Sequence, residues 1–263
     1  MSEDAVLLDV RDGIAHLTLN RPDAVNTFDV ALANALDAQV AAIDADPSVR
    51  AVLLTGAGAR FCGGGDVKSF LAHGVQALDE TLQAIIGALH RAISRLARLD
   101  APVVGAVQGS VAGAGLGLMM SCDIVLSGAS TKFVVAYTGI GVTPDGSSSW
   151  YLPRHIGTAR ALELALTNRV LSADEACAWG LIARVVPDET LFDAAQQLAV
   201  QLAAGPTRAF AGARQLIRDA LARPLEEHLD AEAEQMRRMS HTADALEGIT
   251  AFVEKRPPTF KGE

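Results

Sequence analysis

The strongest constraint on the fold of this chain is a central segment that carries no charge. From Ala101 to Cys122 every side chain is neutral, although a fifth of all residues in the chain are charged. Glycine recurs at every fourth position of the segment, at 105, 109, 113 and 117. This spacing is typical of transmembrane helices that pair closely, so a membrane span is the first alternative to test.

Three features of the segment argue against a membrane span. Pro102 opens it, Gln108 and Ser110 interrupt it, and large apolar side chains are few. A buried strand over Val103–Val107, a tight glycine loop and a buried helix that begins near Leu116 explain the same residues. We therefore predict that the segment forms the core of a globular domain and that the protein has no membrane partner.

Composition sets broad limits on the class of protein. Half of the 263 residues are hydrophobic, which is enough for a large core in one or two domains and excludes disorder. A net charge of −9 argues against nucleic acid as a partner. Three cysteines and an acidic amino terminus without signal-peptide features predict a cytoplasmic protein without a disulfide framework.

Local patterns predict strands mixed with helices in the first part of the chain. Strands over 6–9 and 14–19 flank the turn sequence Arg11-Asp12-Gly13 and predict a hairpin. Apolar residues recur at helical spacing over 78–98 and predict an amphipathic helix. The other predicted elements are a helix over 29–44 and strands over 51–55, 103–107, 124–127 and 132–135.

The second part of the chain is predicted to be mainly helical. Ser172 and Glu175 form a capping-box pattern, so a short helix is expected over 173–179, before Gly180. Long helices are predicted over 190–204, 206–222 and 225–239. The expected fold class is α/β, with a core over 1–200 and a helical carboxy-terminal subdomain over 201–263.

Two glycine-rich loops are the first candidates for a site. One includes Gly56-Ala57-Gly58 and continues through Phe61–Asp66; the other covers Gly109–Gly115. Paired backbone N–H groups in such loops can bind an oxygen that develops negative charge, although tight turns alone explain the same spacing. The glycines are not followed by the Gly-Lys-Ser or Gly-Lys-Thr triplet of a nucleotide P-loop, which excludes that motif. No zinc-ligand spacing is present, so no metal is predicted.

Six separated motifs occur in a consistent order from about residue 5 to 255. They cover residues 19–26, 61–66, 101–109, 112–115, 122–125 and 171–181. Together they resemble the crotonase (enoyl-CoA hydratase/isomerase) superfamily. The resemblance implies a ββα-repeat core, a helical carboxy-terminal part for trimerisation or as a lid, and assembly as trimers or dimers of trimers. It also implies an acyl-CoA thioester substrate, with no cofactor apart from the coenzyme A of the substrate itself.

The resemblance assigns an oxyanion hole for the thioester oxygen. Its two donors are the backbone N–H groups of Gly65 and Ala114, which would stabilise a thioester enolate. Losing one such preset donor typically costs roughly 3 kcal/mol of transition-state stabilisation.

The resemblance also assigns residues that bind the coenzyme A part of the substrate. Ala24 and Gly63 line the adenine and pantetheine path, and Asp66 belongs to the same binding region. Lys255 corresponds to a basic position that reaches a coenzyme A phosphate, in a neighbouring subunit.

The reaction itself is not fixed by the family. The two glutamates of the hydratases correspond here to Gly117 and Tyr137, so two-glutamate hydration is not expected. Asp145 resembles the acid/base of the isomerase branch, whose pattern is similar to that of 1,2-epoxyphenylacetyl-CoA isomerase-like members. Read without the family, Pro144-Asp145-Gly146 is simply a β-turn.

His90 leaves a second reaction open. It lies between Ile86 and Ile93, at the border of the buried face of its predicted helix, where a structural role is the plainer interpretation. With Asp145 it also resembles 4-chlorobenzoyl-CoA dehalogenase, in which the aspartate attacks the ring and the histidine activates water. Tyr137 departs from that pattern, which has tryptophan there, but as a candidate site residue it could still donate a hydrogen bond to Asp145. A third alternative is a non-catalytic acyl-CoA-binding protein.

Two further expectations concern packing. Cys62 and Cys122 lie in apolar runs and are predicted to be small core residues. The acyl pocket depends on how the carboxy-terminal helices pack and on Phe70, His73, Leu82, Ile86, Tyr137 and Trp150.

Overall fold

The main sheet of the molecule has six strands and is mostly parallel. The computed structural model describes residues 4–70, 74 and 77–263. The strand order is β1-β2-β3-β4-β6-β9, in which only the β1–β2 pair is antiparallel. The predicted hairpin is confirmed, with Asp12 and Gly13 at positive φ in its turn. The strands are β1 (Val6–Arg11), β2 (Ile14–Leu19), β3 (Ala51–Gly56), β4 (Val103–Val107), β6 (Ile124–Gly128) and β9 (Arg184–Val186).

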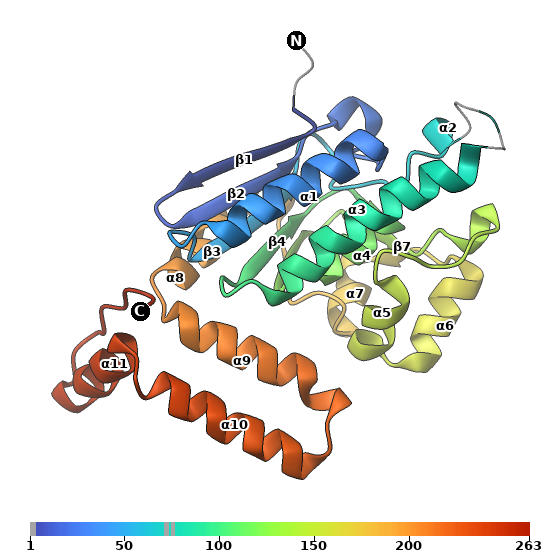
Figure 1. Cartoon of the computed structure of the whole chain (residues 1–263). Helices are drawn as coiled ribbons and strands as arrows, with labels where there is room; N and C mark the ends of the chain where they lie inside the picture. The colour runs from blue at the N-terminus through green and yellow to red at the C-terminus, as the bar shows by residue number, and fades with distance from the viewer. Residues whose placement is uncertain (1–3, 71–73, 75–76) are drawn as a thin grey trace.

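Helices cover both faces of this sheet. The helices α1 (Val30–Ala45) and α3 (Leu78–Arg98) lie side by side across one face, and α8 (Leu191–Ala203) packs on the other (Figure 1). A parallel strand that is covered on both faces has an apolar sequence without polar alternation. The strand β4 is an example, because every one of its residues is buried. The helices predicted over 29–44, 78–98 and 190–204 are confirmed within one residue at each end.

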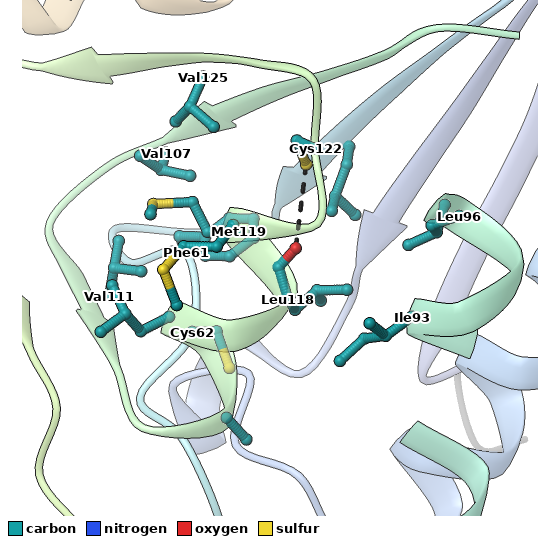
Figure 2. Close-up of a cluster of buried hydrophobic side chains, with 14 of the residues drawn as sticks. Phe61, Cys62, Ile93, Leu96, Val107, Val111, Leu118, Met119, Cys122 and Val125 are labelled. Atoms are coloured by element: carbon teal, nitrogen blue, oxygen red, sulfur yellow. Dashed lines mark hydrogen bonds between the residues drawn. The ribbon is translucent and has the colours of Figure 1, made fainter. Parts of the chain in front are cut away.

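The uncharged central segment forms core structure, as predicted. It folds into β4, a short strand β5 (Ser110–Ala112) and the helix α4 (Ala114–Met120), whose seven residues are all buried. Figure 2 shows Leu118 and Met119 of α4 among side chains from β4 and α3. In the ranges that the structure describes, no helix is long and apolar enough to cross a membrane.

Two details of this segment differ from the sequence prediction. The helix begins at Ala114, two residues before the predicted start, because Gly113 adopts φ 50° and ψ −122° immediately before it, a combination that favours glycine. The strand β5 was not predicted and replaces part of the expected glycine loop. It joins a second sheet, of order β5-β7-β8, with β7 (Lys132–Val134) and β8 (Leu171–Ser172).

The second part of the chain is mainly helical, as predicted. Ser172 and Glu175 form the predicted capping box at the start of α7 (Ala173–Ala178). The helix predicted over 206–222 is shorter, because Pro206 precedes it and the chain tightens into a 3₁₀ turn at Ala220. The remaining helices are α2 (Val67–Phe70), α5 (Ser148–Ile156), α6 (Thr158–Thr167), α9 (Thr207–Asp219), α10 (Leu225–Met239) and α11 (Ala243–Glu254), of which α2, α5, α6 and α11 were not predicted.

The helices α9, α10 and α11 form a carboxy-terminal arm (Figure 1). Asp123, which follows α4, anchors the arm by accepting 2.8 Å ion pairs from both Arg214 and Arg218 of α9. The helix α8 ends at Ala203 and belongs with the sheet by its packing. The predicted domain division at residues 200 and 201 stays a prediction.

Candidate active site

The two glycine-rich loops predicted from the sequence lie against each other. The N–H of Cys62 donates to the carbonyl of Ser110 at 3.2 Å, and the N–H of Ala112 donates to the carbonyl of Cys62 at 3.0 Å. A methyl group on Gly115 would lie 2.6 Å from Cβ of Cys62, so only glycine permits this approach. The contact places the first turn of α4 beside the Cys62–Asp66 loop.

Two N–H groups on these loops are available to a ligand. Within residues 4–70, 74 and 77–263, neither the N–H of Gly65 nor that of Ala114 has a hydrogen-bond acceptor. The N–H of Gly113, between the loops, is used by the carbonyl of Val134 at 3.2 Å. The N–H groups of a helix's first turn have no acceptor within the helix, so that of Ala114, beside the free N–H of Gly65 on the adjoining loop, could accept an electron-rich oxygen as its partner.

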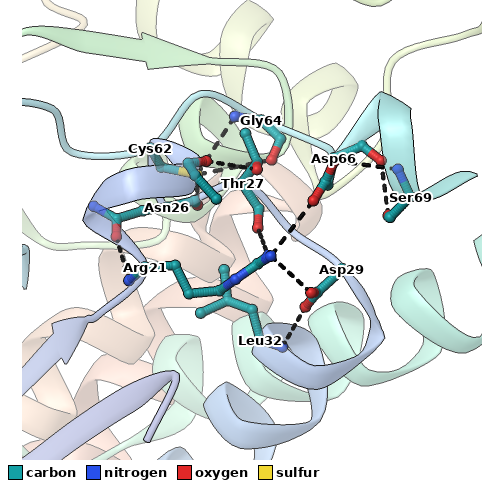
Figure 3. A network of polar contacts seen from close by, with 10 residues as sticks. Arg21, Asn26, Thr27, Asp29, Leu32, Cys62, Gly64, Asp66 and Ser69 are labelled. Carbon is teal, nitrogen blue, oxygen red and sulfur yellow. Dashed lines mark hydrogen bonds and ion pairs between the residues drawn. The ribbon is translucent and has the colours of Figure 1, made fainter. Parts of the chain in front are cut away.

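A polar network centred on Arg21 holds the first loop from below (Figure 3). The Arg21 guanidinium contacts Asp29 at 2.9 Å and Asp66 at 3.5 Å, and it donates to the carbonyl of Thr27 at 2.6 Å. Asp29 also caps α1, and Asp66 accepts from the N–H of Ser69 at 3.2 Å. The Asp66 carboxylate is therefore occupied inside the protein, and its predicted role toward substrate stays a prediction.

Asn26 and Cys62 fix the loop more directly. The Asn26 side chain donates to the carbonyl of Phe61 at 3.0 Å, and the Cys62 thiol donates to the carbonyl of Asn26 at 3.0 Å. The N–H of Gly64 reaches the Cys62 sulfur at 3.5 Å. Burial raises the pKa of Cys62 to about 12, so the thiol stays protonated and remains a donor. The prediction that Cys62 and Cys122 are core residues is confirmed.

Asp145 lies at the start of a tight turn. The N–H of Ser148 donates to the carbonyl of Asp145 at 3.1 Å, and the central residues Gly146 and Ser147 have φ of 56° and 67°. Positive φ at both central positions is characteristic of a primed β-turn. The turn interpretation and the site interpretation are thus compatible, because the turn presents an Asp145 side chain that is 28% exposed.

His90 and Tyr137 both contact Asp145, through different atoms. His90 Nε2 lies 2.7 Å from Asp145 Oδ1, and the Tyr137 hydroxyl donates to the Asp145 backbone carbonyl at 3.0 Å. The His90 side chain is 50% exposed, so it lies farther from the buried face of α3 than the spacing indicated. Burial, reinforced by the charge of Asp145, raises the pKa of Tyr137 and keeps its phenol neutral.

The turn also excludes a side chain at Gly117. A methyl group on Gly117 would lie 1.9 Å from the carbonyl oxygen of Gly146 and 3.1 Å from the Ser148 hydroxyl. Glutamate at this position is impossible unless the Asp145 turn moves. A carboxylate on α4 and this turn are therefore mutually exclusive in the observed backbone.

Of the remaining residues predicted to bind coenzyme A, Ala24 and Gly63 lie near the glycine-rich loops and Lys255 does not. The N–H of Gly63 donates to the carbonyl of Val25 at 2.9 Å, which places Gly63 beside the Ala24 loop, and a role of the two residues in binding coenzyme A stays a prediction. Lys255 ends α11, which Figure 1 shows at the opposite end of the molecule from α2. Within this chain Lys255 is not brought to the glycine loops, and its predicted role in a neighbouring subunit stays a prediction.

The residues expected to shape the acyl pocket are only partly brought together. The Phe70 ring packs on Gly65, since a methyl group there would lie 2.6 Å from its Cζ, whereas Trp150 and His90 line a hollow that does not include Phe70. Leu82 and Ile86 are half-buried on α3, and His73 lies outside the described residues.

Sequence reasoning missed two residues that contact the Asp145 turn. Leu89 lies against Gly146, where a methyl group would be 3.3 Å from its Cδ2, and Ser148 is fully buried beneath it. Leu89 had the helical spacing of a core residue but no signal for the site. Ser148 had no signal at all.

Comparison with protein families gives a match over nearly the whole chain. The family model described as "Enoyl-CoA hydratase/isomerase" matches residues 9–263. A solved structure of an enoyl-CoA hydratase from Bacillus anthracis superposes with a TM-score of 0.92 at 31% identity, covering 98% of this chain and all of that one.

Two similar proteins carry different activities in their names. The 1,2-epoxyphenylacetyl-CoA isomerase of Escherichia coli is 40% identical over 258 residues, 98% of each chain. The 4-chlorobenzoyl coenzyme A dehalogenase-2 of an Arthrobacter species is 34% identical over 206 residues, 78% of this chain and 75% of that protein.

Proposed function

This chain belongs to the enoyl-CoA hydratase/isomerase family, and we propose that within it the protein moves the double bond of an enoyl-CoA thioester. The N–H groups of Gly65 and Ala114 bind the thioester oxygen. Asp145 removes a proton from the α- or γ-carbon and returns it to the other carbon. The enolate oxygen carries the negative charge in between, and no atom is gained or lost overall.

The observation that carries this proposal is the exclusion of a side chain at Gly117. Hydration needs a second acid/base group to handle water, and the Asp145 turn fills the space that such a group on α4 would need. Asp145 is the carboxylate that remains, and a single carboxylate suffices to shuttle one proton. Tyr137 and Leu89 support the turn that presents it.

His90 is a positioning residue in this reaction. Its 2.7 Å contact engages Oδ1 of Asp145 and leaves Oδ2 for the substrate carbon.

The same contact favours a second candidate, hydrolytic dehalogenation. In that reaction Asp145 attacks the halogen-bearing ring carbon, halide leaves, and an aryl ester forms on the carboxylate. His90 then takes a proton from water, which cleaves the ester to a hydroxyaryl thioester and restores Asp145. Against it, the Tyr137 hydroxyl is committed to the Asp145 carbonyl and does not reach the carboxylate.

We extend the proposal to assembly as a trimer or a dimer of trimers. Large apolar side chains are strongly exposed along the arm in a single chain: Ile217, Leu221, Leu225, Leu229, Met236, Leu246, Ile249, Phe252 and Val253. Exposed apolar area of this extent is typical of a protein–protein interface. Lys255 lies on the same arm and in an assembly would serve the coenzyme A phosphates of another copy.

The test follows proton exchange at the substrate in deuterated water. With a 3-enoyl-CoA, wild-type protein should exchange the α- and γ-protons and yield the 2-enoyl isomer. Asp145→Asn should reduce this exchange by at least about a thousandfold while acyl-CoA affinity is retained. Retained exchange in Asp145→Asn would overturn the role of this residue.

Isotope labelling separates the alternatives. In a single turnover of a 4-halobenzoyl-CoA in ¹⁸O-water, dehalogenation predicts label in the Asp145 carboxylate. An unlabelled carboxylate rejects that reaction. Tight acyl-CoA binding with no proton exchange in wild-type protein would instead identify a non-catalytic binding protein.

A further inference from the structure

A large cavity with many arginines lies between the body of the molecule and its arm. It has a volume of about 640 Å³ and is enclosed by the end of α3, by α5, and by α9 and α10 of the arm. This size is typical of sites that hold a small organic ligand. Five arginines and two aspartates line it, in a chain whose net charge is −9: Arg98, Arg208, Arg214, Arg218, Arg238, Asp100 and Asp219.

Some of these charges already have partners. Arg214 and Arg218 are held by Asp123, and Asp219 pairs with Arg223 at 2.7 Å. Arg238 donates to Glu234 at 2.9 Å, but that carboxylate is shared with Arg237.

Two arginines of the cavity are not neutralised. Arg98 contacts only the uncharged Ser94 hydroxyl, and Arg208 has no side-chain partner within the described part of the chain. Together with the half-neutralised Arg238, they outnumber Asp100, a lining carboxylate without an ion pair among the described residues, and leave the cavity an excess of positive charge for an anionic group.

A second hollow connects this cavity to the candidate catalytic pair. It measures about 320 Å³, begins at His90 and Ser147, and shares Ala97, Trp150 and Tyr151 with the arginine cavity. Between the two ends its wall is mostly apolar. The two hollows therefore form one groove, which we call the α3–α5 groove, with a reactive end and a cationic end.

The length of α3 sets the distance between these ends. Arg98 follows His90 by eight residues on one helix, which corresponds to ~12 Å along its axis. Extended chains cover ~3.8 Å per three covalent bonds, so this distance equals about nine bonds. A medium-length acyl chain would reach from Asp145 to the arginines.

We propose that the acyl group of the substrate ends in a second carboxylate, and that Arg98, Arg208 and Arg238 bind it. This inference rests on the proposed function, because it places the thioester oxygen at Gly65 and Ala114. Arginine matches a carboxylate in both charge and planar geometry. The coenzyme A moiety lies on the other side of the thioester, toward Ala24 and Gly63, so its phosphates are not the anion in this cavity.

The experiment compares two saturated thioesters by calorimetry. Decanoyl-CoA and its ω-carboxy counterpart have equal chain length and no double bond, so binding is measured without turnover. The carboxylate should bind about tenfold or more tightly, and the ratio should fall toward one in Arg208→Gln and in Arg238→Gln. Arg184→Gln is the control, because this exposed arginine of β9 lines neither hollow and shares no carboxylate with the cavity arginines among the described residues, and it should leave the ratio unchanged.

Three other results would overturn the proposal. Equal affinity for the two thioesters would mean that the arginines of the cavity do not bind the ω-carboxylate. If Arg208→Gln and Arg238→Gln both keep the preference for the ω-carboxy thioester, its carboxylate binds outside this cavity. A change in sedimentation of Arg208→Gln without any change in the ratio means that a second copy of the chain covers the cavity. If neither thioester binds, the proposed function is wrong as well. If both bind but the protein exchanges no proton of an enoyl-CoA, only the proposed catalytic role of Asp145 is contradicted.

Discussion

The helices α4 and α10 belong to the same chain and show opposite kinds of burial. All seven residues of α4 are buried, whereas none of the fifteen residues of α10 is. The sequence of α4 is uncharged and rich in glycine, so neighbouring backbone can approach it at Gly115 and Gly117. The sequence of α10 is amphipathic, and its apolar side chains at Leu225, Leu229 and Met236 are more than half exposed.

The difference shows that apolar patterning predicts a buried face without saying what buries it. The neighbours of α4 come from its own chain, and they are the loops that carry the candidate site. The apolar face of α10 stays largely exposed in a single chain, and a second copy would bury it in the assembly proposed above. The candidate site and the proposed assembly surface would then depend on two different kinds of packing, which mutations can separate.

The largest expected effect is at Gly117. Gly117→Ala should destabilise the fold by roughly 3 kcal/mol and abolish activity, because the new methyl group overlaps the Gly146 carbonyl. The matched control is Gly87→Ala in α3, where the nearest atom is the flexible tip of Arg91 at 3.5 Å. That change should stabilise the helix by about 0.5–1 kcal/mol. Chemical denaturation measures both, and equal effects would contradict the packing described for α4.

The second effect concerns assembly. Leu229→Asp adds a charge to the exposed apolar face of α10, so it should raise the subunit dissociation constant at least about tenfold while the fold of each chain is kept. Analytical ultracentrifugation and circular dichroism measure these two properties. Gln201→Asp, which adds a charge on the exposed side of α8, is the control. If Leu229→Asp assembles like the wild-type protein, α10 is not part of the subunit interface.

A smaller effect is expected at Tyr137. Tyr137→Phe removes the 3.0 Å hydrogen bond to the Asp145 carbonyl, which still accepts from the N–H of Ser148. Stability should fall by about 1 kcal/mol. Turnover should fall with little change in KM, since the turn that presents the carboxylate is loosened. A rise in KM at constant kcat would place Tyr137 in substrate binding instead.

The smallest effect is in thiol reactivity, which reports the packing around α4. At pH 8 Cys177 should be alkylated and Cys62 should not, because burial raises the pKa of Cys62 from 9.0 to about 12. A raised thiol pKa in the folded state stabilises the fold below pH 9, and this contribution is lost as the pH rises from 9 to 12. Mass spectrometry after iodoacetamide treatment measures the labelling, and rapid labelling of native Cys62 would show that its shell opens readily.

Most of the fold could be predicted because periodic burial leaves a strong trace in sequence. The helices α1, α3 and α10 and the hairpin were located in this way. The strand β5 was missed because its three residues lie among glycines, whereas α11 was missed although Thr242 caps its start and Asp244 lies in its first turn. Of the candidate site, the two glycine loops and Asp145 were predicted, whereas the approach of Gly146 to Gly117 joins residues 29 positions apart and left no local signal.

The sequence by itself determined the family, the α/β core and the neutral segment that had to be buried. The tertiary structure decided that the turn after Pro144 occupies the space beside α4, that His90 reaches Asp145, and that the end of α3 faces the arginines of the arm. The physical reason is that secondary structure follows from local periodicity and backbone preference. Site geometry instead follows from close contacts between distant segments, which a linear pattern does not encode.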